Sequence, residues 1–249
     1  MASIKRVLAT DIDGTLIGYG GERELAEFLH AAPELGIIYL TGRTKANAEA
    51  MLRQYGFPAP VAMATDIGAD IYWGPQYRLD DQWAFAQRRD WAPRRVQAVL
   101  ADVPGVTFLG RSSHWRLAYH VDGERVLSQV QTRLVEGGVV ARTLWHDAEN
   151  RLDVIPRGAF KGRALKHILD RLALKAHQCF VAGDADNDID ILEGRYLGVL
   201  VANSVPRLRS RAAEQIWRSP YPGALGVLDA LKRWLAEQPE LLTSKAVTL

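Results

Sequence analysis

Two parts of the chain repeat the same order of short apolar runs and amphipathic segments. In the first part, strand-like runs at 4–10, 36–40 and 61–65 alternate with helix-like segments at 22–32 and 45–55. In the second part, helical periodicity at 161–174, 189–193 and 223–237 surrounds apolar runs at 179–184 and 197–203. Strands that alternate with helices predict parallel pairing through crossover helices. We therefore expect an α/β protein in which both parts form one doubly wound parallel sheet.

The pattern changes between these two parts. Short strand-like runs surround helix-like segments at 92–103 and 124–138, which is typical of an antiparallel sheet with helices on one face. We expect an inserted α+β cap domain over residues 80–155, with a core formed by residues 1–79 and 156–249. The last dozen residues show no clear period, and we expect them to fray.

Composition narrows the class of protein. The 249 residues are 48% hydrophobic and 24% charged, with a net charge of +2, as in an ordinary soluble globular protein. Neither a nucleic-acid field nor a membrane-spanning run is present, and the N-terminal apolar stretch is too short for a secretory signal. We expect a cytoplasmic monomer without nucleic-acid or membrane partners. The single cysteine, Cys179, lies in an apolar run and is expected in a buried strand.

Several reactive side chains follow the ends of predicted core strands or begin a helix. These are Asp11, Asp13, Thr41, Lys161, Asp184 and Asp188. The carboxyl ends of parallel strands meet at one edge of an open sheet, where such proteins bind ligands. We therefore expect a single site there.

The residue types in this group suggest phosphoryl transfer. Two carboxylates about 4 Å apart repel by about 4 kcal/mol at an effective dielectric constant of about 20, and a divalent cation relieves that repulsion. All-oxygen ligands favour Mg²⁺ over zinc. Lys161 and Thr41 add a positive charge and a hydroxyl, which suit a phosphate oxygen.

Four segments, in this order, resemble the motifs of the haloacid dehalogenase superfamily of phosphatases: DIDGT at 11–15, TGR at 41–43, Lys161 and GDADND at 183–188. The resemblance implies a Rossmann-like core. It also implies that Asp11 is the nucleophile that forms an aspartyl-phosphate, and that Asp13 is the general acid and base. Thr41 and Lys161 would hold the phosphoryl group.

The same resemblance implies a cofactor and a set of contacts. Mg²⁺ would bind Asp11, the main-chain carbonyl of Asp13 and Asp184, with Asp188 supporting them. The expected substrate contacts are Gly42, Arg43, Asp70, Tyr119, His120 and Asn187. Strand alternation separates two of these residues. Tyr119 shares a face with Trp115 and Leu117, whereas His120 shares the other face with Arg116, so only one set can face a ligand.

The insert suggests the substrate. Segments at 68–72, 114–122 and 151–162 are similar to sucrose-6-phosphate phosphatases and their mannosylfructose-phosphate relatives. We expect a sugar phosphate, with sucrose 6-phosphate first and mannosylfructose phosphate or glucosylglycerol phosphate as alternatives, and an enzyme of the sucrose-phosphate synthase type as its supplier. Two other readings stay open, a phosphohexomutase and a non-catalytic sugar-phosphate-binding protein.

The acidic stretch GDADNDID at 183–190 also permits a calcium loop. An EF-hand beginning at Asp184 needs Gly at its sixth position and Glu at its twelfth, but the chain has Ile189 and Arg195. That interpretation fails. We expect Asp186 to stabilise a helix start, where the helix dipole favours a carboxylate, and Asp190 to be structural or solvated.

Overall fold

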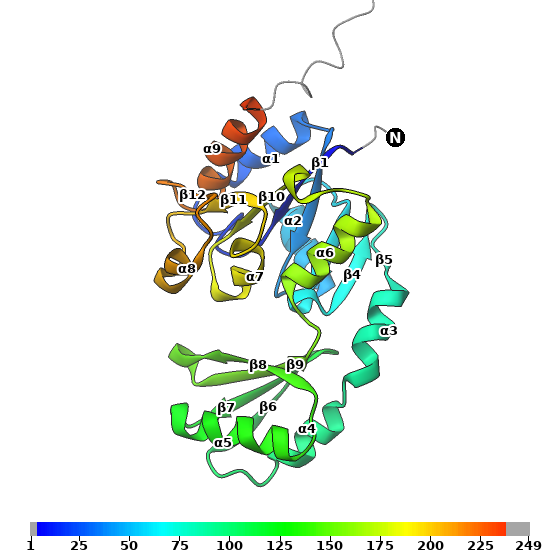
Figure 1. Cartoon of the computed structure of the whole chain (residues 1–249), viewed down its shortest axis with the longest axis vertical. Helices are drawn as coiled ribbons and strands as arrows, with labels where there is room; N and C mark the ends of the chain where they lie inside the picture. The colour runs from blue at the N-terminus through cyan, green and yellow to red at the C-terminus, as the bar shows by residue number, and fades with distance from the viewer. Residues whose placement is uncertain (1–3, 238–249) are drawn as a thin grey trace, which may run out of the picture.

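The protein consists of two β-sheets, each with its own helices, in a computed structural model that describes residues 4–237 (Figure 1). The expected fraying of the last dozen residues lies outside this range. No helix within it is long and apolar enough to span a membrane.

The larger sheet has eight strands in the order β12-β11-β10-β1-β2-β3-β4-β5. Its parallel strands are β1 (Arg6–Thr10), β2 (Leu35–Leu40), β3 (Ala62–Thr65), β10 (Cys179–Gly183), β11 (Leu197–Leu200) and β12 (Ile216–Arg218). Two antiparallel strands, β4 (Asp70–Trp73) and β5 (Arg78–Leu79), extend one edge. The two parts of the chain therefore form one sheet, with β10 beside β1. Cys179 is buried in it, as expected.

Helices cover both faces of this sheet. On one face, α1 (Glu22–Ala31), α2 (Lys45–Gln54) and α9 (Gly223–Ala236) pack against alternate strand residues. On the other face, α6 (Lys161–Arg171), α7 (Ile189–Leu192) and α8 (Pro206–Arg211) form a second apolar cluster. Because both faces are buried, the central strands are continuous apolar runs. The prediction of a doubly wound α/β core is confirmed.

The smaller sheet forms the cap. Its four strands are antiparallel, in the order β6 (Val106–Ser113), β7 (Arg116–Val121), β9 (Arg151–Pro156) and β8 (Ala141–His146). Helices α4 (Pro93–Leu100) and α5 (Gly123–Glu136) pack on one face around Trp115 and Val130. Figure 1 shows these helices on the side of the cap sheet away from the core. The other face of the sheet is thus turned toward the core.

Among the α-helices and strands that the structure describes, three were not predicted from the sequence. Helix α3 (Asp81–Asp90) carries the chain from the core to the cap, and Asp80 caps it by accepting a hydrogen bond from the Trp83 amide at 3.0 Å. Its sequence, DQWAFAQRRD, has a weak apolar period because the helix bridges two domains. The other two are α8 and the three-residue edge strand β12, both too short to produce a periodic signal.

Candidate active site

Strand order brings the sequence motifs together. Thr10 of β1 pairs with Ala182 of β10 on one side and with Tyr39 of β2 on the other. Residues that directly follow these strands therefore meet at one edge of the sheet. Asp11 follows β1, Thr41 follows β2 and Asp184 follows β10, and the Asp11 amide donates to the Ala182 carbonyl at 3.1 Å.

Lys161 is fully buried between two carboxylates. Its Nζ lies 2.8 Å from Asp11 Oδ1 and 2.7 Å from Asp188 Oδ1. A third contact, to Asn187 Oδ1, is 3.4 Å long. Lys161 is the first residue of α6, whose apolar face is packed on the sheet, so the helix fixes where the ammonium points. The arrangement offers a charge at a defined position beside Asp11.

The site carries more negative charge than Lys161 neutralises. Burial raises the pKa of Asp11 to about 8. The attraction to Lys161 opposes this rise, and repulsion from Asp188 and Asp184 adds to it. Burial, with repulsion from Asp188, raises the pKa of Asp184 to about 6. Burial of Lys161 opposes its charge, yet the facing carboxylates raise its pKa above the ordinary value. A bound cation would favour the ionised carboxylates.

Three carboxylates are close enough to hold that cation. One oxygen atom each of Asp11, Asp184 and Asp188 lies within 4.8 Å of the others. The donors are all oxygen atoms, which suits a hard divalent ion. Asp188 is also a positioning residue, because its Oδ2 accepts hydrogen bonds from the amides of Asp184 and Ala185 at 3.1 and 3.2 Å.

The position of Asp184 depends on contacts with DIDGT that the sequence alone did not predict, although Gly14 is expected there as a turn residue. Thr15 Oγ1 donates to Asp184 Oδ1 at 2.8 Å. Gly14 has φ +78°, and a Cβ there would collide with Asp184 Oδ2. A Cβ on Gly183 would come within 2.7 Å of Asp188 Cγ. The glycines in DIDGT and GDADND are therefore needed for close approach of carboxylates, in addition to any turn they form.

Asp13 is held by Arg43 and does not join the three carboxylates. Arg43 Nη2 donates to Asp13 Oδ1 at 2.6 Å, and Arg43 Nε donates to Oδ2 at 2.8 Å. Half of the Asp13 side chain is exposed, compared with 5% for Asp11. Asp11 is thus enclosed, while Asp13 lies where a leaving group and water can reach it.

Thr41 and Gly42 connect the core to the cap. Thr41 is fully buried and its Oγ1 accepts a hydrogen bond from the Arg43 amide at 3.0 Å. The Gly42 carbonyl accepts a hydrogen bond of 2.5 Å from Arg116 on cap strand β7. Arg116 Nη2 also lies 3.6 Å from Asp66 Oδ1. The sequence placed Arg116 on one face of its strand, and only the fold shows that this face reaches the core.

The other expected substrate contacts lie in different parts of the structure. Asn187 lies beside Lys161, and its Nδ2 is 3.9 Å from the position of a Cβ on Gly42. Asp70, on β4, accepts a hydrogen bond from the Tyr72 hydroxyl at 3.3 Å. His120 is on the core-facing side of β7, where Nε2 lies 3.1 Å from Asp122 Oδ1. Of these, Asn187 is the residue next to the buried lysine.

Tyr119 is not placed for substrate contact. It is 2% exposed in the apolar cluster between the cap sheet and its helices, next to Trp115 and Leu117. Burial raises the pKa of Tyr119 to about 12. The expectation that Tyr119 contacts the substrate is therefore corrected, because its face of β7 forms the cap core.

The core-facing side of the cap sheet is charged. Asp153 of β9 lies at its centre with 2% of its side chain exposed. Its carboxylate is 3.1 Å from Arg151 Nε, 3.5 Å from Arg116 Nη1 and 3.5 Å from His146 Nε2. Burial opposes ionisation of Asp153, but the hydrogen bond from His146 and the two arginines hold its pKa below the ordinary value. This face presents fixed polar donors toward the core.

Two expectations for GDADNDID can also be compared with the structure. Asp190 Oδ2 accepts a hydrogen bond of 2.7 Å from the Gly162 amide in the first turn of α6, so it ties that helix to the acidic loop. Burial raises the pKa of Asp190. Asp186 is exposed at the start of a short 3₁₀ turn, Asp186–Asp188, away from the buried carboxylates.

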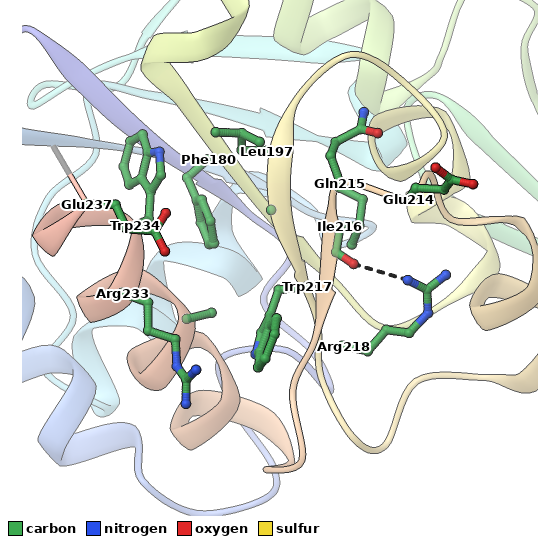
Figure 2. Close-up of a pocket in the computed structure, with 12 residues that line it drawn as sticks. Phe180, Leu197, Glu214, Gln215, Ile216, Trp217, Arg218, Arg233, Trp234 and Glu237 are labelled. Atoms are coloured by element: carbon green, nitrogen blue, oxygen red, sulfur yellow. Dashed lines mark hydrogen bonds between the residues drawn. The ribbon is translucent and has the colours of Figure 1, made fainter.

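A cavity at the β12 edge of the core sheet is lined by none of the expected site residues. It measures about 450 Å³ and lies between β12 and α9, where Trp217, Arg233 and Trp234 line it (Figure 2). Arg233 lies over the Trp217 ring at 4.8 Å, and Arg218 donates to the Ile216 carbonyl at 3.2 Å. We assign no chemistry to this cavity.

Known proteins match the chain along most of its length. The mannosylfructose-phosphate phosphatase of Agrobacterium fabrum (strain C58 / ATCC 33970) is 27% identical over 242 residues, covering 92% of this chain and 96% of the relative. The glucosylglycerol-phosphate synthase of Pseudomonas anguilliseptica is 29% identical over 236 residues, although the match spans only 30% of that longer protein.

A solved structure is also similar to the chain along most of its length. The sucrose-phosphatase of Synechocystis sp. PCC6803, solved in complex with sucrose and phosphate, superimposes with a TM-score of 0.79 at 25% identity, covering 92% of this chain and 98% of that one. The family of sucrose-6F-phosphate phosphohydrolases matches residues 4–235. The chain therefore belongs to this family of haloacid dehalogenase-type phosphatases and is a phosphoric monoester hydrolase.

Proposed function

We propose that the protein hydrolyses sucrose 6-phosphate to sucrose and phosphate. The observation that carries this proposal is the buried Lys161 between Asp11 and Asp188, at 2.8 and 2.7 Å, beneath a cap with a charged face. The family match over residues 4–235 supports sucrose phosphate as the first candidate substrate.

The chemistry proceeds in two steps. A carboxylate oxygen of Asp11 attacks phosphorus, and the bond from phosphorus to the sugar oxygen breaks as Asp13 donates a proton to that oxygen. Water then attacks the phosphorus of the aspartyl-phosphate, gives its proton to Asp13 and restores Asp11. Lys161 and Thr41 stabilise the charge on the phosphoryl oxygens.

We infer that the cation is Mg²⁺, bound by Asp11, Asp184 and the Asp13 carbonyl with Asp188 in support. When bound, Mg²⁺ neutralises charge on the phosphoryl group and the carboxylates. The close approach of Asp11, Asp184 and Asp188, whose oxygen atoms lie within 4.8 Å of one another, supports this assignment. Burial first, and then mutual repulsion, raises the pKa of Asp11 and Asp184, and a cation would favour their ionised form.

Recognition of the sugar is assigned to the core-facing side of the cap. Arg116, His120 and Arg151 offer donors that complement a hydroxyl-rich ligand. The cap closes over the substrate in this proposal and excludes bulk water. Asn187, beside Lys161, and Asp70, on β4, are further candidate contacts from the core.

One alternative substrate has a specific observation in its favour. The chain spans 96% of a mannosylfructose-phosphate phosphatase at 27% identity, so mannosylfructose phosphate is the second candidate. Glucosylglycerol phosphate is the third, because of the partial match to a glucosylglycerol-phosphate synthase. A phosphohexomutase would return the phosphoryl group to a sugar instead of to water.

The test is release of phosphate from the three glycosyl phosphates by purified protein with Mg²⁺. We expect the highest kcat/KM for sucrose 6-phosphate. A higher value for mannosylfructose phosphate would move the assignment to that substrate, and isomerised hexose phosphate without free phosphate would indicate a mutase. A cytoplasmic location, a monomeric state and a synthase that supplies the substrate complete the proposal.

A further inference from the structure

A second cavity lies where the core and cap are connected. It measures about 580 Å³ and lies between α3, β8 and the segment 157–160 that returns from the cap to α6. The cavity contacts both connections between the domains, and Gln87 of α3 donates to the Gly158 carbonyl across them at 3.4 Å. No residue of the catalytic group lines it.

Four arginines line this cavity, Arg89, Arg142, Arg157 and Arg163, against a single acid, Asp90. Asp90 is already paired with Arg89, with Oδ1 3.3 Å from Nε. The lining therefore has a net charge of +3. Like charges gathered around one cavity repel, and a bound anion relieves that repulsion.

Two of these arginines have no partner of their own. Within residues 4–237, the guanidinium groups of Arg157 and Arg163 have no hydrogen bond or ion pair with another residue. Arg163 Nη1 lies over Gly158, 3.1 Å from the position of a Cβ there, so the absence of a side chain at 158 leaves room for the guanidinium. Unpaired guanidinium groups are suited to bidentate recognition of phosphate.

Arg142 forms the fixed wall of the cavity. Its Nη1 donates to the Ala159 carbonyl at 2.7 Å, and its guanidinium lies 3.8 Å from the centre of the Phe160 ring. Phe160 directly precedes Lys161 in the chain. A ligand in this cavity would thus touch cap strand β8, the return segment and the helix that carries the buried lysine.

We propose that this cavity is a second binding site, which takes a phosphorylated small molecule whose phosphate is held by Arg157 and Arg163. The volume exceeds what a lone phosphate needs and falls in the range of small-molecule sites. Because the site spans both connections, occupancy favours one arrangement of cap and core. The proposal is independent of which sugar phosphate the enzyme hydrolyses.

The test is calorimetric titration of the full-length protein with inorganic pyrophosphate, in EDTA so that no metal complex forms. Arg157→Gln/Arg163→Gln is compared with the wild type and with Arg94→Gln/Arg207→Gln, which removes the same charge from exposed positions outside the cavity. Binding of pyrophosphate at the catalytic group is common to the three proteins and cancels in the comparison.

We expect Arg157→Gln/Arg163→Gln to lose the cavity-bound equivalent of pyrophosphate or to bind it at least about tenfold more weakly, because charge-assisted hydrogen bonds are lost. The Arg94→Gln/Arg207→Gln protein should bind like the wild type, and Arg157→Lys/Arg163→Lys should recover part of the affinity. Equal binding by wild type and the cavity variant overturns the proposal, as does an equal loss in the control.

Circular dichroism and turnover of p-nitrophenyl phosphate show whether the cavity variant is folded. If the double variant does not fold, pyrophosphate binding by the single variants Arg157→Gln and Arg163→Gln is compared with that of the wild type instead. Turnover of p-nitrophenyl phosphate at the wild-type rate, combined with lost pyrophosphate binding, separates this site from the catalytic one.

Discussion

Arg43 holds Asp13 in a two-pronged ion pair, with Nη2 2.6 Å from Oδ1 and Nε 2.8 Å from Oδ2. Both side chains are partly exposed, so the pair adds only about 0–1 kcal/mol to stability. Its consequence is geometric, because the two bonds fix the carboxylate that transfers the proton in the proposed mechanism. A lysine at 43 keeps the charge but loses the fork.

We therefore expect Arg43→Lys to lower kcat for the sugar phosphate by about 10- to 100-fold through lost positioning. The loss for p-nitrophenyl phosphate should be smaller, since its leaving group departs without a proton. The melting temperature should stay near the wild-type value. Arg53→Lys, which alters an exposed pair with Glu49, is the control. Equal losses on both substrates would contradict a role of Arg43 in positioning Asp13 for protonation of the leaving group.

Gly14→Ala should disable the acidic group by displacing Asp184. The added Cβ collides with the Asp184 carboxylate, so we expect kcat to fall by about 10- to 100-fold, as when support around a metal site is removed. More Mg²⁺ should be needed for half-maximal activity.

Gly18→Ala is the matched control, because Gly18 has φ +116° and nothing within 4 Å of its Cβ position. It introduces backbone strain of about 1 kcal/mol without a clash. If both variants lose activity equally, strain and not the approach to Asp184 explains the need for Gly14.

Tyr119→Phe should leave kcat/KM unchanged, because its hydroxyl is buried in the cap core without a hydrogen-bond partner in the described structure. Removing an unsatisfied buried hydroxyl should also raise the free energy of unfolding, by up to about 1 kcal/mol.

By contrast, Arg116→Gln should raise KM, since Arg116 donates a hydrogen bond to the Gly42 carbonyl from the core-facing side of the cap. A raised KM in Tyr119→Phe would contradict the orientation of the cap sheet.

Asp80 lies where the chain enters the cap, and its surroundings make the free energy of unfolding depend on pH. It accepts hydrogen bonds from Trp73 Nε1 at 3.0 Å and from the Trp83 amide at 3.0 Å, and lies 2.9 Å from His167 Nε2. Burial opposes ionisation, but these bonds hold the pKa of Asp80 below its ordinary value. The carboxylate therefore stabilises the fold above the unfolded-state pKa, and this contribution is lost as pH falls through the folded-state pKa.

Asp80→Asn should lower the free energy of unfolding at pH 7 by about 1–2 kcal/mol. The gap to the wild type should begin to narrow below about pH 4, where the unfolded chain takes up a proton at Asp80, and should close as pH falls through the lowered folded-state pKa. Urea denaturation across this range measures the gap, with exposed Asp81→Asn as the control. A gap that does not change with pH would mean that Asp80 acts through packing alone.

The sequence predicted the core, and the meeting of several polar side chains at one edge of its sheet, for a physical reason. A strand buried on both faces is a continuous apolar run, and the carboxyl ends of parallel strands converge, so Asp11, Thr41 and Asp184 could be placed together before the fold was known. The sequence contains no comparable pattern that predicts individual contacts between segments far apart in the chain. The Asp190–Gly162 bond and the Arg116–Gly42 contact belong to this class.

The cap was harder to interpret. Alternation along β7 separated Tyr119 from Arg116 but could not show which face lies against the helices, because both sets contain large side chains. Helix α3 was missed because it bridges the domains and lacks a single apolar face. The buried face of β7 and the formation of α3 both depend on tertiary packing.

The central claim is that Asp11 is the nucleophile of a sugar-phosphate phosphatase. The most direct test is release of phosphate from sucrose 6-phosphate with Mg²⁺ by the wild type and by Asp11→Asn, which preserves size and removes the nucleophilic charge. We expect steady release by the wild type and a loss of at least about 10³-fold in Asp11→Asn. Equal release by the two proteins would contradict the claim.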